Sequence, residues 1–314
     1  MEIRFLSHGS IKTGGYRHEL FLAQTLEQNN VNHVLKLLRK PYDAQGARHL
    51  KLQWWGFKNT YSEMVVVGGR LALVALLRNV FSRNRIYIVL HHFDTEDGKS
   101  TALQLYYASL FHFLSCFKKR VQVITVSPYF QAFFQQKLER DILLFPNFFD
   151  TQYLSKFSTT HKKKLICLGQ WSKKNSAEIF VLAELLARRG YECYFSSLNK
   201  DMAGQKEHYK IICFETYESY LQPLAECIYT IAFPAINEGW NRVAHESILV
   251  GTTVIGLKKG GLGNLLEESN MLSIHSAEEA LALILSDIHP KANQSFIEKY
   301  DIAKAPSWLP HFPA

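Results

Sequence analysis

Short apolar runs alternate along the chain with longer segments whose apolar residues recur at helical spacing. The apolar runs predict strands at residues 3–7, 31–38, 64–67, 86–90 and 121–126 and then at 165–168, 192–195, 211–214, 228–233, 253–255 and 271–274, and those at 64–67, 86–90 and 121–126 are expected to be buried. Helical periodicity is clearest at residues 70–82, 100–117, 176–189 and 276–288. Because strands that alternate with helices form parallel sheets covered by helices, the sequence predicts an α/β fold.

The pattern is long enough for two α/β domains. The chain has 314 residues, 47% of them hydrophobic, which can fill two cores of ~150 residues each. Residues 151–164 are polar and contain three consecutive lysines, so they predict a hinge. We predict two Rossmann-like domains, at residues 1–157 and 158–314. The first strand is not followed by a G-x-G-x-x-G fingerprint, which argues against a nicotinamide or flavin enzyme.

The most informative segment covers residues 228–263, where two predicted strands flank a helix that opens near Asn241. Glu238 lies just before this helix and Glu246 lies inside it, roughly 12 Å away if the stretch were helical throughout. That separation is similar to the reach from a ribose to a sugar across a diphosphate. The backbone N–H groups of residues 239–242 would face an anion between the two carboxylates. The segment therefore suits a nucleotide-sugar.

This segment, with Gly260 and Gly261 after its second strand, resembles the Glu-x7-Glu signature of retaining glycosyltransferases of the GT-B fold, family 4 type. Gly14-Gly15 ahead of a helix resembles the family's Gly-rich loop. Residues 143–150 resemble its Pro-Asn-Gly-Val-Asp passage, with Phe148 in the place of glycine. The resemblance implies a GT-B protein, in which two Rossmann-like domains face a central cleft and the C-terminal tail crosses back to the first domain.

The resemblance also implies roles for individual residues. Glu238 would contact the transferred sugar, His91 or His92 would approach it from the first domain, and Lys174 would hold the diphosphate. Glu246 would accept hydrogen bonds from the ribose hydroxyls. The further residues implied to bind the nucleotide-sugar are Gly14, Gly15, Gln170, Lys173, Gly239, Trp240, Asn241, Arg242, Gly260 and Gly261.

One position departs from the family pattern. Gln170 stands where the family has an arginine, which removes a bidentate phosphate donor and its charge. Arg242 is the candidate to supply that charge. Because the remaining cations and helix amides can neutralise the leaving diphosphate, the resemblance implies a reaction without a metal or a cofactor.

Three other interpretations stay open at this point. The departures at Gln170 and Phe148 also fit a non-catalytic GT-B partner protein that binds sugar or protein ligands. A nucleotide-sugar epimerase of the same fold would share the cleft. The acidic run at residues 94–97 resembles a metal-binding motif of the other glycosyltransferase fold, although a helix-capping turn explains it as well.

The net charge of +8 favours anionic partners, which include phosphorylated substrates, anionic membranes and nucleic acid. The resemblance selects the nucleotide-sugar, with a glycan or lipid-linked acceptor in cell-surface polysaccharide synthesis, and no nucleic acid. Five scattered cysteines indicate reduced thiols. No signal-peptide pattern and no apolar run of ~20 residues is present, so the sequence predicts a cytoplasmic protein.

Attachment to an anionic membrane surface is a second open question. Residues 39–60 are basic, are expected to be irregular and contain Trp54-Trp55, which suits either an acceptor or membrane-surface loop or a buried aromatic pair. The aromatic helix predicted at residues 103–117 suits a buried helix or a membrane face. The two interpretations of this helix differ in the exposure of four side chains, Tyr106, Tyr107, Phe111 and Phe113.

Overall fold

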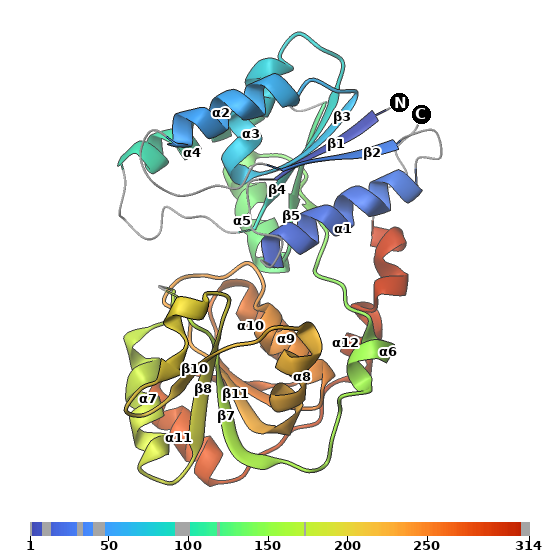
Figure 1. The fold of residues 1–314 in the computed structure, drawn as a ribbon. Coiled ribbons are helices and arrows are strands. Elements are labelled where there is room, and N and C mark those ends of the chain that lie inside the picture. The colour runs from blue at the N-terminus through green and yellow to red at the C-terminus, as the bar shows by residue number, and fades with distance from the viewer. Residues whose placement is uncertain are drawn as a thin grey trace. The chain divides into compact units, whose positions relative to one another are not determined.

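The computed structural model describes residues 2–7, 14–29, 34–39, 48–91, 101–117, 120–172 and 174–308 (Figure 1). The chain forms two compact units, one from Met1–Asn147 with Ala305–Ala314 and one from Phe148–Lys304. The division at Phe148 comes ahead of the predicted boundary at residue 157, and the residues from Ala305 onward belong to the first unit.

The first unit contains a six-stranded parallel sheet in the order β2-β1-β3-β4-β5-β6. Its strands are β1 (Glu2–Ser7), β2 (Val34–Arg39), β3 (Met64–Gly68), β4 (Arg85–Leu90), β5 (Val121–Thr125) and β6 (Leu143–Leu144). Its helices are α1 (Gly14–Gln28), α2 (Arg48–Asn59), α3 (Gly69–Arg78), α4 (Thr101–Cys116) and α5 (Pro128–Leu138). Alternate strand residues pack on α2 to α5, while α1 contacts β1 and β3.

The aromatic helix α4 is a core helix. Tyr107 and Phe111 are buried, and Tyr106 and Phe113 pack against the same core. The Tyr106 hydroxyl donates a hydrogen bond of 2.6 Å to the Gly69 carbonyl. The interpretation of this segment as a buried helix is therefore confirmed.

The expectation of an irregular segment at residues 39–60 is wrong over its second half, where α2 forms. Leu52 and Trp55, three residues apart, place one face of α2 on the core of the first unit. Gly56 and the adjacent tryptophans lower the intrinsic helix preference of this stretch, so its periodicity is weak in the sequence. Packing against the core supplies the stability that the local sequence lacks.

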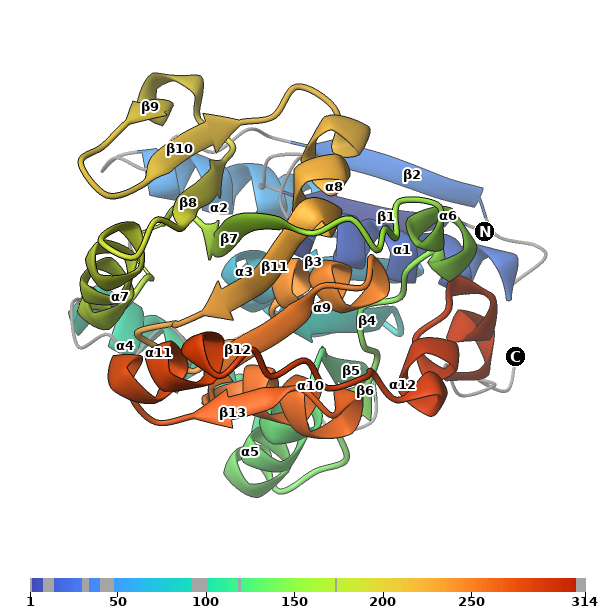
Figure 2. The ribbon, with the colours of Figure 1, turned by 90° about the horizontal axis from the view of Figure 1, so that it is seen from below.

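The second unit contains a seven-stranded sheet in the order β13-β12-β11-β7-β8-β10-β9, parallel except for β9 (Figure 2). Its strands are β7 (Lys163–Gln170), β8 (Glu192–Ser197), β9 (Gly204–Gln205), β10 (Lys210–Cys213), β11 (Cys227–Ala232), β12 (Thr253–Leu257) and β13 (Leu272–Ile274). Its helices are α6 (Thr151–Ser155), α7 (Ala177–Ala187), α8 (Tyr217–Glu226), α9 (Arg242–Leu249), α10 (Gly260–Ser269), α11 (Ala277–Leu285) and α12 (Gln294–Lys299), with a 3₁₀ turn at Lys200–Met202. A further 3₁₀ segment, Ile302–Trp308, includes the point at which the chain passes from the second unit to the first.

Successive strand residues of the second sheet face two different cores. Ile166, Leu168 and Ile231 pack with α7 and α11. Cys167 and Cys227 point the other way and pack with α6, α8 and α9. All five cysteines are free, as the sequence predicts.

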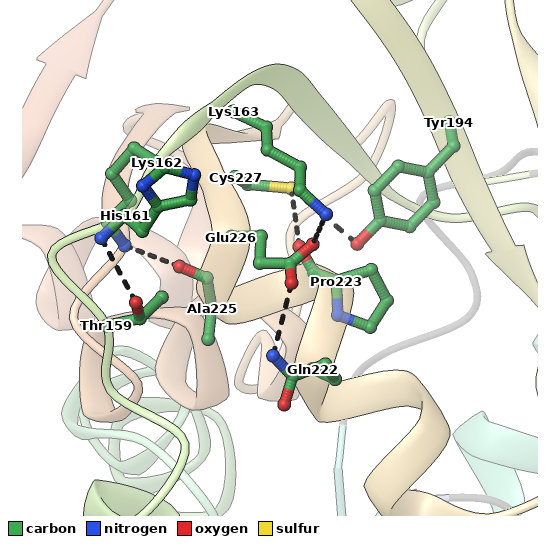
Figure 3. Close-up of polar contacts among 10 residues, drawn as sticks. All are labelled: Thr159, His161, Lys162, Lys163, Tyr194, Gln222, Pro223, Ala225, Glu226 and Cys227. Atoms are coloured by element: carbon green, nitrogen blue, oxygen red, sulfur yellow. Dashed lines mark hydrogen bonds and ion pairs between the residues drawn. The ribbon is translucent and has the colours of Figure 1, made fainter.

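The lysine run at residues 162–164 lies at the start of β7, and its first two side chains bind other parts of the second unit (Figure 3). The Lys162 ammonium donates hydrogen bonds to the Ala225 carbonyl at 2.7 Å, the Gly251 carbonyl at 2.8 Å and the Thr252 hydroxyl at 3.1 Å. Lys163 forms an ion pair with Glu226. Partial burial lowers the pKa of Lys162. The end of the predicted hinge is therefore tied to the ends of α8 and α9.

Replacement of Lys162 by alanine is expected to lower the free energy of unfolding by about 1–3 kcal/mol, because it leaves two carbonyls without their donor. Urea denaturation at neutral pH measures this loss. Lys164→Ala is the matched control, since its ammonium is exposed, donates a hydrogen bond to the Arg189 carbonyl and lies 4.7 Å from the Tyr191 ring centroid. Equal stability losses in the two variants would contradict the role of Lys162.

Candidate functional site

The predicted strand–helix–strand motif is present as β11, α9 and β12, with β11 and β12 adjacent and parallel. Asn241 is the N-cap of α9, and its side-chain carbonyl accepts a 2.8 Å hydrogen bond from the Ala244 amide. Gly239 and Trp240, which the sequence predicts as ligand-binding residues, are buried in the loop before this cap. Loops at the carboxyl ends of parallel strands are the usual place for ligands.

Glu238 lies in the loop between β11 and α9, where its backbone pairs with the start of α10. Its carbonyl accepts a 2.7 Å hydrogen bond from the Gly261 amide. Gly260 has a φ of +56°, and a Cβ there would lie 2.6 Å from the Glu238 carbonyl oxygen, so a larger residue would displace the loop. The Asn241 side-chain amide donates a 2.7 Å hydrogen bond to Glu238 Oε2. Two predicted site glycines and the helix cap thus hold Glu238 in position.

Glu246 is 5% exposed and is surrounded by donors. Its Oε1 accepts hydrogen bonds from the Tyr217 hydroxyl at 3.0 Å and from Arg242 Nη2 at 3.2 Å. Its Oε2 accepts one from the Tyr220 hydroxyl at 3.0 Å. Burial, with the neighbouring carboxylate, raises the pKa of Tyr220 well above its usual range. The arrangement holds the Glu246 carboxyl group inside the unit, with two hydroxyls and one guanidinium as its donors.

Tyr217 and Tyr220 are not among the site residues predicted from the sequence, because no helix is expected at α8. Pro223 inside the helix obscures its periodicity. A signal was present in Thr216 and Ser219, which form a reciprocal capping box at its first turn. That signal locates the helix but does not say that its hydroxyls reach Glu246.

The Arg242 side chain is directed toward Glu246 and Phe149. Its guanidinium forms an ion pair with Glu246 and lies over the Phe149 ring, 4.6 Å from the centroid. The proposal that Arg242 compensates for Gln170 at a diphosphate stays a prediction. Gln170 is the exposed last residue of β7.

Behind the site, Trp240 and His245 form a buried pair. Trp240 Nε1 donates a 2.9 Å hydrogen bond to His245 Nδ1, which assigns the imidazole proton to Nε2. His245 is fully buried among the rings of Phe149, Phe296 and Tyr300. Burial lowers the pKa of His245 well below its usual 6.5. The imidazole is therefore neutral and packs α9 against α12.

The buried imidazole predicts a loss of stability in mild acid. The pKa of His245 is depressed in the folded state, so below the unfolded value of 6.5 the unfolded chain binds the extra proton. Its contribution is complete above pH 6.5 and decreases as pH falls, by up to about 1.4 kcal/mol per pH unit. Urea denaturation at several pH values measures the slope. His245→Gln should flatten the dependence of the unfolding free energy on pH, whereas His275→Gln, at an exposed position, should leave it unchanged. Parallel pH profiles for His245→Gln and the parent would exclude the contribution of His245.

The loop after β7 lies beside the Glu238 loop. The Lys174 carbonyl accepts a 2.7 Å hydrogen bond from the Ala235 amide, and Asn175 pairs with Pro234. Lys259, the N-cap of α10, donates to the Pro234 carbonyl at 3.3 Å. Lys174 and Glu238 are thus brought to one edge of the sheet. Lys259 lies there too; it was not predicted as a site residue, although it directly precedes Gly260. Lys173 lies outside the described residues.

In the first unit, His91 follows β4 and pairs with Glu19 of α1, with Nε2 3.2 Å from Oε1. Glu19 is 6% exposed, and a Cβ on Gly68 would lie 2.4 Å from Glu19 Oε1, so this glycine makes room for the carboxylate. The ring of His18 contacts His91 edge-on at 5.1 Å. A Cβ on Gly15 would lie 3.5 Å from His91 Nε2.

The structure therefore brings two predicted residues, Gly15 and His91, together at the start of α1, which begins at Gly14. Glu19 was missed, although it lies one turn beyond the glycine pair and is charged within an otherwise apolar helix face. His92 and the acidic run at residues 94–97 lie outside the described residues.

Comparisons with known proteins identify the fold. No protein-family model and no curated protein matches the chain. HepE of Anabaena, in complex with UDP and glucose, is 16% identical with a TM-score of 0.71, over 98% of this chain and 97% of that one. Sucrose-phosphate synthase from Thermosynechococcus elongatus is 11% identical with a TM-score of 0.69, over 98% and 96%.

WaaG, a glycosyltransferase involved in lipopolysaccharide biosynthesis, is 13% identical with a TM-score of 0.63, over 97% of each chain. These similarities cover both units, each of which has a mainly parallel sheet between helices. The chain thus has the GT-B fold that the sequence predicts.

Proposed function

We propose that this protein is a retaining, metal-independent glycosyltransferase that moves a sugar from a nucleotide-sugar to a glycan or lipid-linked acceptor. The observation that carries the proposal is the convergence of Glu238, Lys174 and the start of α9 at one sheet edge of a GT-B unit. Solved structures of the similar HepE contain UDP with glucose, and UDP-glucose. A nucleotide-sugar is the ligand that this combination suits best.

In the proposed reaction Glu238 contacts the transferred sugar, with the Asn241 amide fixing its carboxylate. Lys174 lies near the diphosphate, on which negative charge grows as the glycosidic bond breaks. Glu246 accepts a hydrogen bond from the ribose. A carboxylate offers about four acceptor positions and Glu246 has three donors, so room remains for a hydroxyl. The participation of His91 stays a prediction.

The proposed setting is cell-surface polysaccharide synthesis by a cytoplasmic protein with peripheral membrane attachment. The resemblance of the Glu238–Glu246 segment supports it, as does the similarity to WaaG in fold. Among the described residues, no helix has the length and apolar character to span a bilayer.

The rival proposal is a non-catalytic binding protein, favoured by Gln170 in place of a diphosphate-binding arginine. A panel of nucleotide-sugars tested by thermal shift comes first, because a ligand at 100 times its Kd stabilises the folded state by about 2.7 kcal/mol. We expect at least one donor to raise the Tm. If no nucleotide-sugar and no nucleoside diphosphate raises it, the glycosyltransferase proposal fails, while a binding protein for other sugar or protein ligands remains. Binding without any transfer or slow hydrolysis would favour the binding protein.

Turnover is expected to persist in the presence of a chelator, since Lys174 and helix amides neutralise the leaving diphosphate in the proposed reaction. The measurement compares nucleoside diphosphate release with and without EDTA, using the donor found by thermal shift. Complete loss of release in EDTA, with recovery on addition of manganese, would contradict metal independence.

A further inference from the structure

Large apolar side chains are exposed along α2 and at the end of α3. Phe81, in the turn after α3, is 99% exposed, Leu50 of α2 is 73% exposed and Trp54 of α2 is 60% exposed. Tyr61 and Leu77 are also exposed. We call this surface the α2–α3 face and define it by those five side chains with four exposed cations, Lys51, Lys58, Arg78 and Arg83. Single exposed apolar residues are ordinary, but a group of this size needs an explanation.

Ring and cation contacts join aromatic residues of this face with two of its cations. Trp54 stacks on Phe57, and the Lys58 ammonium lies 4.9 Å from the Trp54 ring centroid. Arg78, from α3, lies over both Phe57 and Tyr61, at 5.4 and 4.8 Å.

A hydrogen bond also joins the ends of α2 and α3. The Asn79 side-chain amide donates a 2.8 Å hydrogen bond to the Thr60 carbonyl, which ties the ends of α2 and α3 together. Phe81 follows that tie by two residues, and Leu50 precedes Trp54 by one helical turn. The α2–α3 face is therefore continuous across two helices of the first unit.

The segment that carries the α2–α3 face is strongly basic. From residue 48 to residue 85 the chain has seven lysines and arginines and one acidic residue, Glu63. Cations interleaved with exposed aromatic and aliphatic side chains are characteristic of surfaces that lie at the headgroup level of a bilayer. There the apolar side chains enter the acyl boundary while the cations meet anionic headgroups.

Other occupants fit less well. A second copy of this chain on the same face would place like charges opposite one another. Nucleic acid would use the cations and stack on Trp54, but it would leave Leu50, Leu77 and a fully exposed Phe81 in water.

We propose that the α2–α3 face docks the protein on an anionic lipid bilayer. The inference specifies the membrane attachment of the proposed function, and its physical basis is independent of the transfer reaction. In this arrangement Phe81, Trp54 and Leu50 enter the interface. Lys51, Lys58 and Arg83 bind the anionic headgroups electrostatically, while Arg78 also holds the aromatic cluster together.

The test uses the full chain in flotation with phosphatidylcholine vesicles that contain or lack phosphatidylserine. We expect binding only when phosphatidylserine is present, with weakening by salt. The double variant Trp54→Ser and Phe81→Ser should weaken binding at least tenfold. Removing two charges in Lys51→Gln with Lys58→Gln should weaken it about 25-fold, at about fivefold per cation.

Matched controls come from the second unit. Leu285→Ser removes an apolar side chain that is 52% exposed on α11, and Lys210→Gln removes an exposed cation. Both should bind vesicles like the parent. Every variant is also tested by thermal shift with the donor, so that loss of vesicle binding is separated from loss of folding or of the nucleotide site.

Three results would overturn the proposal. The first is equal flotation of the parent on both vesicle types or on neither. The second is flotation of the apolar variant at the parental level. The third is evidence that something else occupies the face. Such evidence would be RNA binding without vesicle binding, or a dimer in sedimentation that Phe81→Ser dissociates. Failure of vesicle binding with an intact donor shift would leave the glycosyltransferase proposal standing.

Discussion

Replacement of Glu246 by alanine is expected to lower the free energy of unfolding by about 3–5 kcal/mol, because a partly buried guanidinium loses its buried carboxylate partner. Arg242 is 21% exposed at its side chain and has Glu246 as its ion-pair partner. The hydroxyls of Tyr217 and Tyr220 lose their acceptor at the same time. Urea denaturation at neutral pH measures the effect.

Glu238→Ala is the matched control for stability, since Glu238 is partly exposed and its carboxylate accepts a hydrogen bond from the neutral Asn241 side-chain amide. Donor affinity is best measured on Glu246→Gln, which keeps the shape and one acceptor oxygen. We expect it to bind the donor more weakly by about 1.5–3 kcal/mol, the value of a charge-assisted hydrogen bond. Unchanged calorimetric affinity would remove Glu246 from the nucleotide site.

Lys174→Ala is expected to lower kcat about 10²- to 10³-fold, the usual cost of removing one group that stabilises transition-state charge. Donor affinity should fall less, because charge on the diphosphate is greater in the transition state than in the bound donor. The comparison needs kcat from nucleoside diphosphate release and Kd from calorimetry, on parent and variant.

The matched control is Lys210→Ala, which removes an exposed lysine of β10 that pairs with Glu192. It should leave both quantities unchanged. A double change of Lys174 and Arg242 should cost more than either single change if both cations act on the diphosphate. A loss of donor affinity with unchanged kcat in Lys174→Ala would indicate uniform binding and remove the catalytic role.

The buried strands were predictable because nearly every residue in them is apolar. β3 and β12 are buried along their whole length, and the apolar runs at residues 64–67 and 253–255 show this directly. The start of α9 was predictable from Asn241, whose side chain caps the helix in the way its residue type favours. Local patterns therefore sufficed where one short segment determines its own structure.

The partners of the two glutamates were not predictable in the same way. Tyr217 reaches Glu246 across 29 residues of sequence, and His91 meets Glu19 across 72. Such contacts depend on the sheet order, which places distant segments side by side. The helix α2 was missed for a related reason, because packing on the core overrides the weak helix preference around Gly56.

The most direct test of the proposed function is release of nucleoside diphosphate from the donor panel by the purified protein, compared with Glu238→Gln. If the chain is a glycosyltransferase, the parent releases nucleoside diphosphate from at least one nucleotide-sugar. This release is faster with an extract-derived acceptor, and Glu238→Gln strongly reduces its rate. No release from any donor, or equal release by the parent and Glu238→Gln, would contradict it.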